Sequence, residues 1–499
     1  MSHADNGGES ELILAAEDCA PEDFDSLHRF TSRNDLRVLL ALEAHGPVLL
    51  RGGRGTGKSA FMIAASRRLD PLVPTSSAVG VYMSLRHAPL LKSTGDTYGR
   101  LLCEIIIRSV KDTLGMRSQG FQPDLNVGDV QYALSKLANK LGKRIVLFFD
   151  DAAHLGREAS LEEFFDIYRT LSGSSVSCKA AIYPGVTRFG TRFDVYNDAT
   201  VVDLLRSEEL PGFNETFSAV MNARFPHDFE TSGSRSLPKS MVAGFLAQAV
   251  LGNMRGFIFA SKALKDHCGD GSVGVSELNE ALISLAANYY WPLLDEIRPK
   301  LGKYEAMIPF AQEIASHVFL EVGQKSRNPR DIIVHRELDE RLSKALQILE
   351  YAGFITKREA SRALKSGGRG ARYALNLCTL LEQTPGARLT RELLERWTAS
   401  PREEAVQFQR TSQLATLPLP TLPDSADLGI FGQSIEILRI SKVYPYGLTD
   451  HKINILMNAN VRTVGDLAEM TDAQLDALPM VGSAHVARIR NVLGQAIWM

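Results

Sequence analysis

The chain of 499 residues is long enough for about two to four domains, and its hydrophobic content of 44% suits a globular protein with sizeable cores. The formal net charge is only −2, which excludes a protein that binds nucleic acid through its overall charge. The five cysteines contain no Cys-x-x-Cys pair, and no apolar run reaches the roughly eighteen residues of a membrane span. We therefore expect a cytoplasmic protein without disulfides, without a zinc cluster of that kind and without a membrane segment.

The N-terminal residues 1–27 are acidic and lack the basic segment of a signal peptide, so we expect a flexible tail. Ser32 then begins an amphipathic helix with leucines at helical spacing, and His45-Gly46-Pro47 ends it.

Residues 52–59 read Gly-Gly-Arg-Gly-Thr-Gly-Lys-Ser and match the phosphate-loop pattern G-x-x-x-x-G-K-[ST]. The apolar residues 48–50 before the loop predict a buried strand, and residues 60–69 after it predict a helix. In this setting backbone N–H groups converge on phosphate oxygens, Lys58 contacts the β- and γ-phosphates, and Ser59 holds Mg²⁺. A glycine-rich turn with an exposed lysine is the structural alternative. The residues expected to bind the nucleotide are Gly52, Gly53, Arg54, Gly55, Thr56, Gly57, Lys58, Ser59 and Ala60.

A second motif, about ninety residues further on, is an apolar strand over 143–149 that ends in Asp150 and Asp151. Continuous apolar runs are typical of central parallel strands, and an acid at the carboxyl end of such a strand holds Mg²⁺ in phosphate-loop enzymes. We assign Asp150 to the metal and Asp151 to the attacking water. The alternative is that the two acids only cap the next helix.

Strand signals at 79–84, 177–183 and 200–205 alternate with helical patterns at 98–113, 127–141 and 162–171. This alternation predicts an α/β fold with a parallel sheet covered by helices, and a nucleotide-binding core over 28–206. Residues 207–320 are helical and form an expected lid, in which Arg255 begins a helix after a Gly-Asn turn. The alternative is that Arg255 occupies a solvent-exposed position on this helix.

Residues 321–395 predict a small winged-helix domain, because a helix ends at Gly353 and two strands, over 354–363 and 371–380, flank a glycine-rich tip. The segment 354–375 has one acid and six basic residues, which suits phosphate contacts with DNA. A solvated edge strand protected by charge is the alternative. The basic residues are Lys357, Arg358, Arg362, Lys365, Arg369 and Arg372.

The proline-rich residues 396–433 predict a linker, and residues 434–499 predict a compact helical domain. Within it Thr471 and Gln474 form a capping box, and Gly482 and Ser483 begin a helix whose free N–H groups suit a phosphate. This segment resembles a helix-hairpin-helix and the C-terminal domain of the bacterial RNA polymerase alpha subunit. Such domains bind DNA or protein, and both remain open.

The order of these motifs resembles the initiator-clade AAA+ ATPases, the relatives of the origin recognition complex, particularly their bacterial and STAND-like members. The resemblance implies ATP and Mg²⁺ as ligands, a lid arginine at Arg255 that senses the γ-phosphate, and homo-oligomers. It also implies a residue after the fourth strand that senses the nucleotide, Tyr183 or Thr187. An arginine finger from a neighbouring subunit is implied as well, with Arg188, Arg192 and Arg206 as candidates. Asp151 departs from the usual Glu, which implies slow hydrolysis.

We thus expect an ATP-driven switch that acts on DNA. The alternative is an ATP-gated, oligomerising scaffold that recruits an effector protein, for example in antiphage defence, without binding DNA.

Overall fold

The structure, a computed structural model, describes residues 15–70, 76–86, 90, 93–153, 158–186, 189–229, 236–268, 272–365, 367–399, 404–423, 429–441 and 447–498. Among these residues no helix is both long and apolar enough to cross a membrane.

The nucleotide-binding motifs lie on a five-stranded sheet in which every pair of neighbouring strands is parallel. The strand order is β2-β3-β4-β1-β5. The strands are β1 (Val48–Arg51), β2 (Ala78–Ser84), β3 (Arg144–Ala153), β4 (Val176–Ile182) and β5 (Thr200–Asp203). Because β1 and β3 flank β4 and all three strands are parallel, the phosphate loop and the two acids lie at the same edge of the sheet. The predicted α/β fold with a parallel sheet is confirmed.

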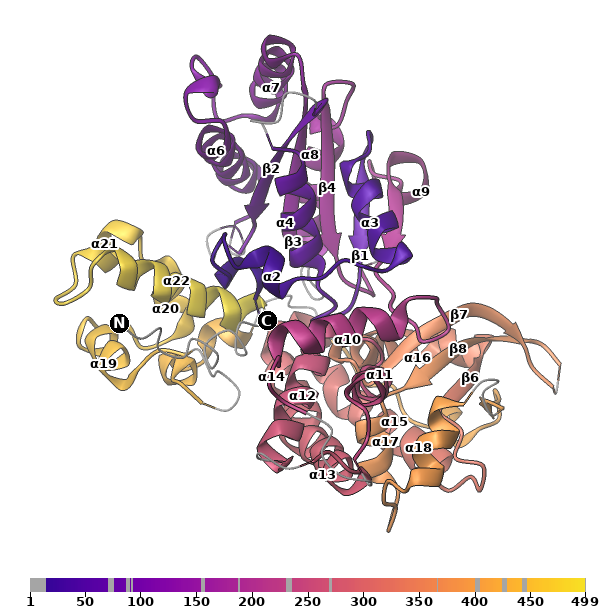
Figure 1. Cartoon of the computed structure of the whole chain (residues 1–499). Helices are drawn as coiled ribbons and strands as arrows, with labels where there is room; N and C mark the ends of the chain where they lie inside the picture. The colour runs from indigo at the N-terminus through magenta and orange to yellow at the C-terminus, as the bar shows by residue number, and fades with distance from the viewer. Residues whose placement is uncertain are drawn as a thin grey trace.

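Helices cover both faces of this sheet and make a three-layered unit (Figure 1). Along β3 the side chains alternate: Val146 and Phe148 face one core, whereas Leu147 and Phe149 face the other. The first face carries α3 (Arg33–Glu43) and α4 (Lys58–Arg68). The second carries α6 (Gly95–Leu114), α7 (Val127–Leu141) and α8 (Glu158–Leu171), and the short α9 (Val195–Asp198) precedes β5.

The expected flexible tail is wrong for residues 15–27. This segment contains the 3-10 helix η1 (Ala16–Asp18) and the short helix α2 (Phe24–Leu27). Phe24 and Leu27 are buried in the core beside α4. The expectation failed because it considered the acidic composition of the segment and not these two apolar side chains. Residues 1–14 lie outside the described part of the chain.

The next part of the chain is helical, as expected. It comprises α10 (Phe213–Arg224), α11 (Lys239–Ala249), α12 (Met254–Cys268), α13 (Val275–Leu285), the π-helix η3 (Ala286–Tyr290), α14 (Trp291–Ile297) and α15 (Met307–Gly323). One continuous apolar core joins these helices to a second sheet.

The second sheet has the order β7-β8-β6-β9. Its strands are β6 (Asp331–His335), β7 (Ile355–Ala363), β8 (Arg369–Leu375) and β9 (Val406–Phe408), and α16 (Arg336–Ala352) packs against it. We call β6, α16, β7, β8 and β9 the second-sheet unit. Gly353 has φ +83° and ends α16, as its position predicted.

Two expectations in this region are wrong. The strand expected over 371–380 ends at Leu375, because the Asn376 side chain caps a helix, α17 (Leu377–Gln383). The helix α18 (Arg391–Thr398) follows. Part of the expected linker is also folded, because β9 pairs with β6 and Arg341 donates to the carbonyl oxygens of Leu414 and Leu417.

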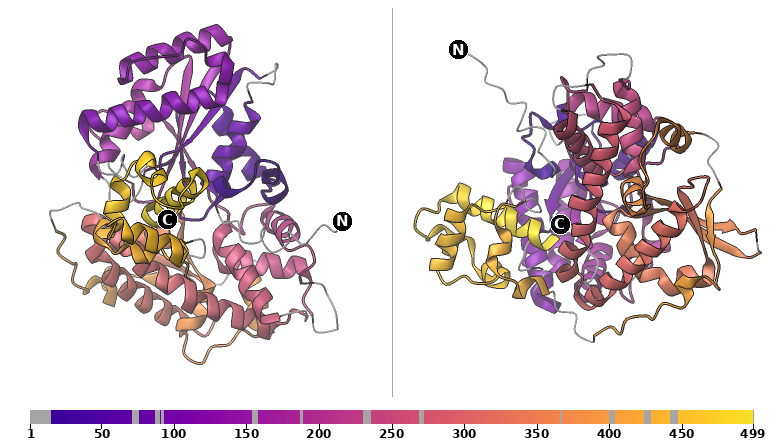
Figure 2. Two further views of the ribbon diagram at one scale, coloured as in Figure 1. Left: turned by 90° about the vertical axis from the view of Figure 1, so that its left-hand side faces the viewer. Right: turned by 90° about the horizontal axis from the view of Figure 1, so that it is seen from below.

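The C-terminal unit, residues 429–498, has its own apolar core. Its helices are α19 (Asp450–Asn458), α20 (Val464–Glu469), α21 (Asp472–Asp476) and α22 (Ser483–Trp498), and the capping box of Thr471 and Gln474 is present. Figures 1 and 2 show this unit beside the N-terminal segment. Asn491 of α22 lies 3.4 Å from Asp18, and a Cβ on Gly494 would contact Arg86.

Candidate nucleotide-binding site

The phosphate loop has a backbone that its glycines permit. Gly55 and Gly57 have φ of +78° and +95°, where other residues are strained, and Gly57 is the residue before α4. A Cβ on Gly52 would lie 2.6 Å from Thr56 Oγ1. Because α4 begins at Lys58, the N–H groups of its first turn have no partner inside the helix and face the loop.

Lys58 is buried at the centre of this loop. Its Nζ donates to the carbonyl oxygens of Gly52 and Gly53 at 2.9 and 3.0 Å, and lies 3.7 Å from the centre of the Tyr183 ring. Burial lowers the pKa of Lys58 to about 7. Ala60, the last residue of the predicted set, lines the same pocket as Lys58 and also packs in the core behind the loop.

Ser59 and Asp150 come together, although ninety residues separate them. The Asp150 carboxylate is fully buried, accepts a hydrogen bond from Ser59 and accepts another from Tyr82 Oη at 2.8 Å. Burial, followed by the charge of Asp151, raises the pKa of Asp150. A hydroxyl and a carboxylate oxygen are ligands that Mg²⁺ prefers, so the pair fits that ion.

Asp151 lies within β3, has φ +53° and is buried. Its Oδ2 accepts from Arg86 Nε at 2.6 Å, and its Oδ1 accepts from Tyr183 Oη at 3.3 Å. Tyr183, one of the two candidates for a residue that senses the nucleotide, thus lies beside Asp151 and Lys58, whereas Thr187 lies outside the described residues.

Three side chains of the site escaped the sequence analysis: Glu17, Tyr82 and Arg86. Arg86 bridges Asp151 and Glu17, with Nη1 at 2.9 Å from Glu17 Oε2, and Tyr82 Oη lies 2.9 Å from Glu17 Oε1. Burial raises the pKa of Glu17 to about 8. Carboxylate oxygens of Glu17, Asp150 and Asp151 lie within 4.8 Å of one another. The only sequence signal for these three residues was the polar Tyr82 inside an apolar strand. Glu17 could not be predicted from nearby residues, because it reaches the site from the N-terminal segment.

Helix α12 and the turn before it contact the loop from the other side. The backbone N–H of Arg255 donates to Gly55 O at 3.0 Å, and Asn253 Nδ2 donates to Arg54 O at 2.6 Å. A Cβ on Gly55 would lie 2.6 Å from Arg255 Cβ, so only glycine permits this approach. The Arg255 side chain lines the same pocket as Lys58, and burial lowers its pKa.

The pocket formed in this way is strongly cationic. It lies between the phosphate loop, the helices α10 and α12 and the N-terminal segment. Among the described residues that line it, one is acidic, Asp151, and seven are basic: Arg29, Arg54, Lys58, Arg86, Arg206, Arg224 and Arg255. A cavity with this charge fits a polyanion.

Arg206 does not fit an arginine finger presented to another subunit. Its Nη1 donates to Thr56 O at 2.6 Å, its Nη2 lies 3.4 Å from Asp35, and the side chain is buried, so it holds the phosphate loop of its own chain. Arg192 is 71% exposed and paired with Asp166. Arg188 lies outside the described residues.

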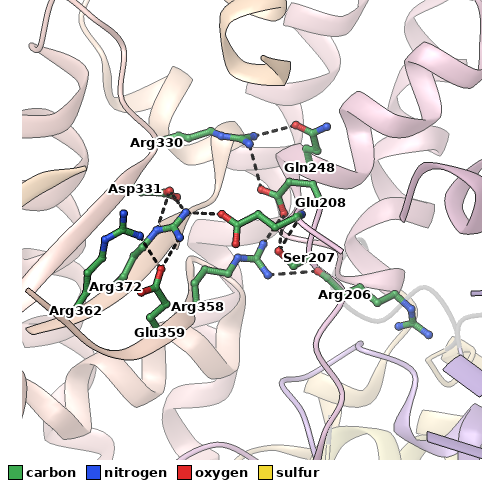
Figure 3. Close-up of polar contacts among 11 residues, drawn as sticks. Arg206, Ser207, Glu208, Gln248, Arg330, Asp331, Arg358, Glu359, Arg362 and Arg372 are labelled. Carbon is green, nitrogen blue, oxygen red and sulfur yellow. Dashed lines mark hydrogen bonds and ion pairs between the residues drawn. The ribbon is translucent and has the colours of Figure 1, made fainter. Parts of the chain in front are cut away.

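The predicted DNA-binding patch is wrong for Arg358 and Arg372, as Figure 3 shows. The Arg358 side chain is 1% exposed and pairs with Glu208 at 2.8 Å. Arg372 is buried and pairs with Asp331, Glu359 and Glu209.

The other four basic residues are more accessible. Lys357 pairs with Asp339 and Arg362 with Glu359, whereas Lys365, 73% exposed, pairs with Glu404. Arg369 is exposed and donates to Ser361. Gly482 has open space around it and immediately precedes α22, which begins at Ser483, far along the chain from these residues.

Comparisons with known proteins gave a distant likeness only. No family model and no curated protein matches the sequence. The Walker-type ATPase PABY2304 of Pyrococcus abyssi has 14% identity and a TM-score of 0.40, over 72% of this chain and 98% of that one. The ORC1 protein of Aeropyrum pernix, solved in complex with DNA, has 14% identity and a TM-score of 0.30, over 78% and 95%. A STAND protein of Pyrococcus horikoshii has 13% identity and a TM-score of 0.29, over 76% and 46%. A likeness this weak gives no basis for an activity or a partner, which must follow from the residues of the site.

Proposed function

We propose that this chain binds ATP with Mg²⁺, hydrolyses it slowly and uses the bound nucleotide to set its conformation. The observation that carries the proposal is the cationic pocket around the phosphate loop, which Lys58 and Ser59 line, with Asp150 hydrogen-bonded to Ser59 behind it. A buried excess of positive charge is costly without an anion, and a loop of free N–H groups at a helix N-terminus suits phosphates.

Each residue of the site has a distinct task. Lys58 exchanges the carbonyl oxygens of its own loop for phosphate oxygens, and Ser59 and Asp150 hold the metal. When bound, Mg²⁺ neutralises charge on the phosphates. Asp151 orients or deprotonates the attacking water. In the described conformation Arg86 occupies Oδ2 of Asp151, so we expect slow turnover.

The test is ATP binding and phosphate release, measured for the parent and for Lys58→Ala. We expect the variant to lose binding, because a phosphate contact and its charge are removed. The matched control is Arg51→Ala, which removes a cation just before the loop that forms an exposed ion pair with Asp203. If Lys58→Ala still binds ATP with micromolar affinity, or if the parent does not bind ATP, the assignment of residues 52–59 as a phosphate-binding loop is contradicted. GTP in the same titration tests selectivity for the base.

We further propose that the ATP-bound form engages DNA through the hairpin between β7 and β8, and through the N-terminus of α22. Support comes from the exposed Lys365 and Arg369 near the hairpin tip. The rival is an oligomerising scaffold that recruits an effector protein, and it is favoured by the burial of Arg358 and Arg372 in ion pairs. Gel shifts with and without ATP and Mg²⁺ over a salt series separate them, since phosphate contacts weaken steeply with salt. No shift at low salt in any nucleotide state favours the scaffold.

A further inference from the structure

Arg54, the third residue of the phosphate loop, has donors that the protein does not use. Its side chain is 10% exposed, and its Nη2 donates to Glu296 Oε1 at 3.2 Å. Its Nε and Nη1 are buried and make no hydrogen bond within the described residues. A guanidinium carries five N–H donors, and buried donors without an acceptor cost free energy. The side chain lines the same pocket as Lys58 and Arg255.

The guanidinium is fixed from outside the loop. Glu296 lies on α14 and also accepts from Lys300 Nζ at 3.0 Å, and Lys300 is buried. The backbone N–H of Arg54 donates to Tyr351 O at 3.3 Å, at the end of α16. The backbone and the side chain of Arg54 are thus both held, so its free N–H groups have a defined direction before any ligand binds.

The charges around Arg54 do not balance. Arg54 and Lys300 share the single negative charge of Glu296, which leaves one positive charge in excess. Arg54 and Arg255 line the same pocket, and burial, followed by repulsion from the charge of Arg54, lowers the pKa of Arg255. Asp151, the acid of this pocket, is already paired with Arg86. An anion between Arg54 and Arg255 relieves this repulsion and accepts the unused donors.

We propose that Arg54 is a ligand of the terminal phosphate of the bound nucleoside triphosphate, and that Glu296 is its positioning residue. The loop N–H groups suit the inner phosphates and Lys58 suits the β- and γ-phosphates, so a phosphate that also reaches both Arg54 and the lid residue Arg255 would be the outermost one. This inference rests on the proposed nucleotide binding and makes the loop itself the element that distinguishes a triphosphate from a diphosphate.

The test compares the affinities of the full chain for a non-hydrolysable ATP analogue and for ADP, each with Mg²⁺, by calorimetry. Arg54→Ala should weaken the analogue by about tenfold or more, as expected for a lost charge-assisted hydrogen bond, and ADP by less than about threefold. We expect Arg54→Ala to fold, because Glu296 keeps Lys300 as its ion-pair partner. Glu296→Gln should lower the ratio of the affinity for the analogue to the affinity for ADP by a smaller factor than Arg54→Ala does. Loss of packing alone would weaken the binding of both nucleotides equally.

The matched control is Arg51→Ala, which should leave both affinities unchanged. Arg54→Lys keeps the charge but not the forked arrangement of guanidinium N–H donors. It should therefore restore only part of the parent's ratio of analogue affinity to ADP affinity. Equal effects of Arg54→Ala on the analogue and on ADP, or no effect on either, overturn the role of Arg54 and leave the ATP proposal standing. A parent chain that binds neither nucleotide refutes the proposed function and this inference with it.

Discussion

Two adjacent acids, Glu208 and Glu209, join the loop after β5 to the second-sheet unit and differ in how much they should contribute to stability. Glu208 is 8% exposed and pairs with Arg358 at 2.8 Å and Arg330 at 3.3 Å, both of them buried (Figure 3). Glu208→Ala removes one partner of a buried ion pair, which costs about 3–5 kcal/mol.

Glu209 is the matched control. It is 43% exposed, and its partner Arg372 retains Asp331 at 2.6 Å and Glu359 at 2.7 Å. Glu209→Ala should therefore cost less than about 1 kcal/mol, as exposed pairs do.

The assay is hydrogen exchange of the backbone amides of β6 and β8, which reports the free energy of local opening without assuming that the whole chain unfolds in one step. Fluorescence melts serve as a second readout. Similar costs below about 1 kcal/mol for both variants would refute the reasoning, because the Glu208 pair would then behave as an exposed one.

Three further predictions concern the site and its surroundings. Asp151→Asn should retain ATP binding and lose turnover by about a hundredfold or more, since the side chain keeps its size but cannot act as a base; phosphate release at the parental rate would leave Asp151 with no role in the chemistry. Burial lowers the pKa of His28 from 6.5 to about 4, so the released N-terminal segment takes up a proton that the docked segment does not. His28 by itself should lower the free energy of unfolding by up to about 3 kcal/mol as the pH drops through that window, opposite in sign to Glu17, whose raised pKa favours the docked segment at low pH. The difference between the parent and His28→Asn in urea unfolding should therefore change by that amount over this range, and a difference independent of pH would contradict it. Replacing Lys365 and Arg369 together with alanine should weaken DNA binding and reduce its salt slope by about two, whereas Arg336→Ala, on the exposed face of α16, should not.

The sequence determined the parts of this protein that depend on neighbours along the chain. The glycines of the phosphate loop, the apolar run of β3 and the caps at Ser32, Thr471 and Gly353 each fix local backbone geometry, and each lies where the pattern predicted. Local chemistry also placed Ser59 and Asp150 at one edge of a parallel sheet, because strands of such a sheet end together.

The tertiary structure alone decided which charges meet. The basic segment 354–375 has a local excess of positive charge, yet Glu208 and Glu209 reach Arg358 and Arg372 from about 150 residues earlier in the chain. Glu17 enters the site in the same way, 65 residues before its neighbour Tyr82. Pairing energies depend on distance in space and on burial, and a count of charges along the chain contains neither.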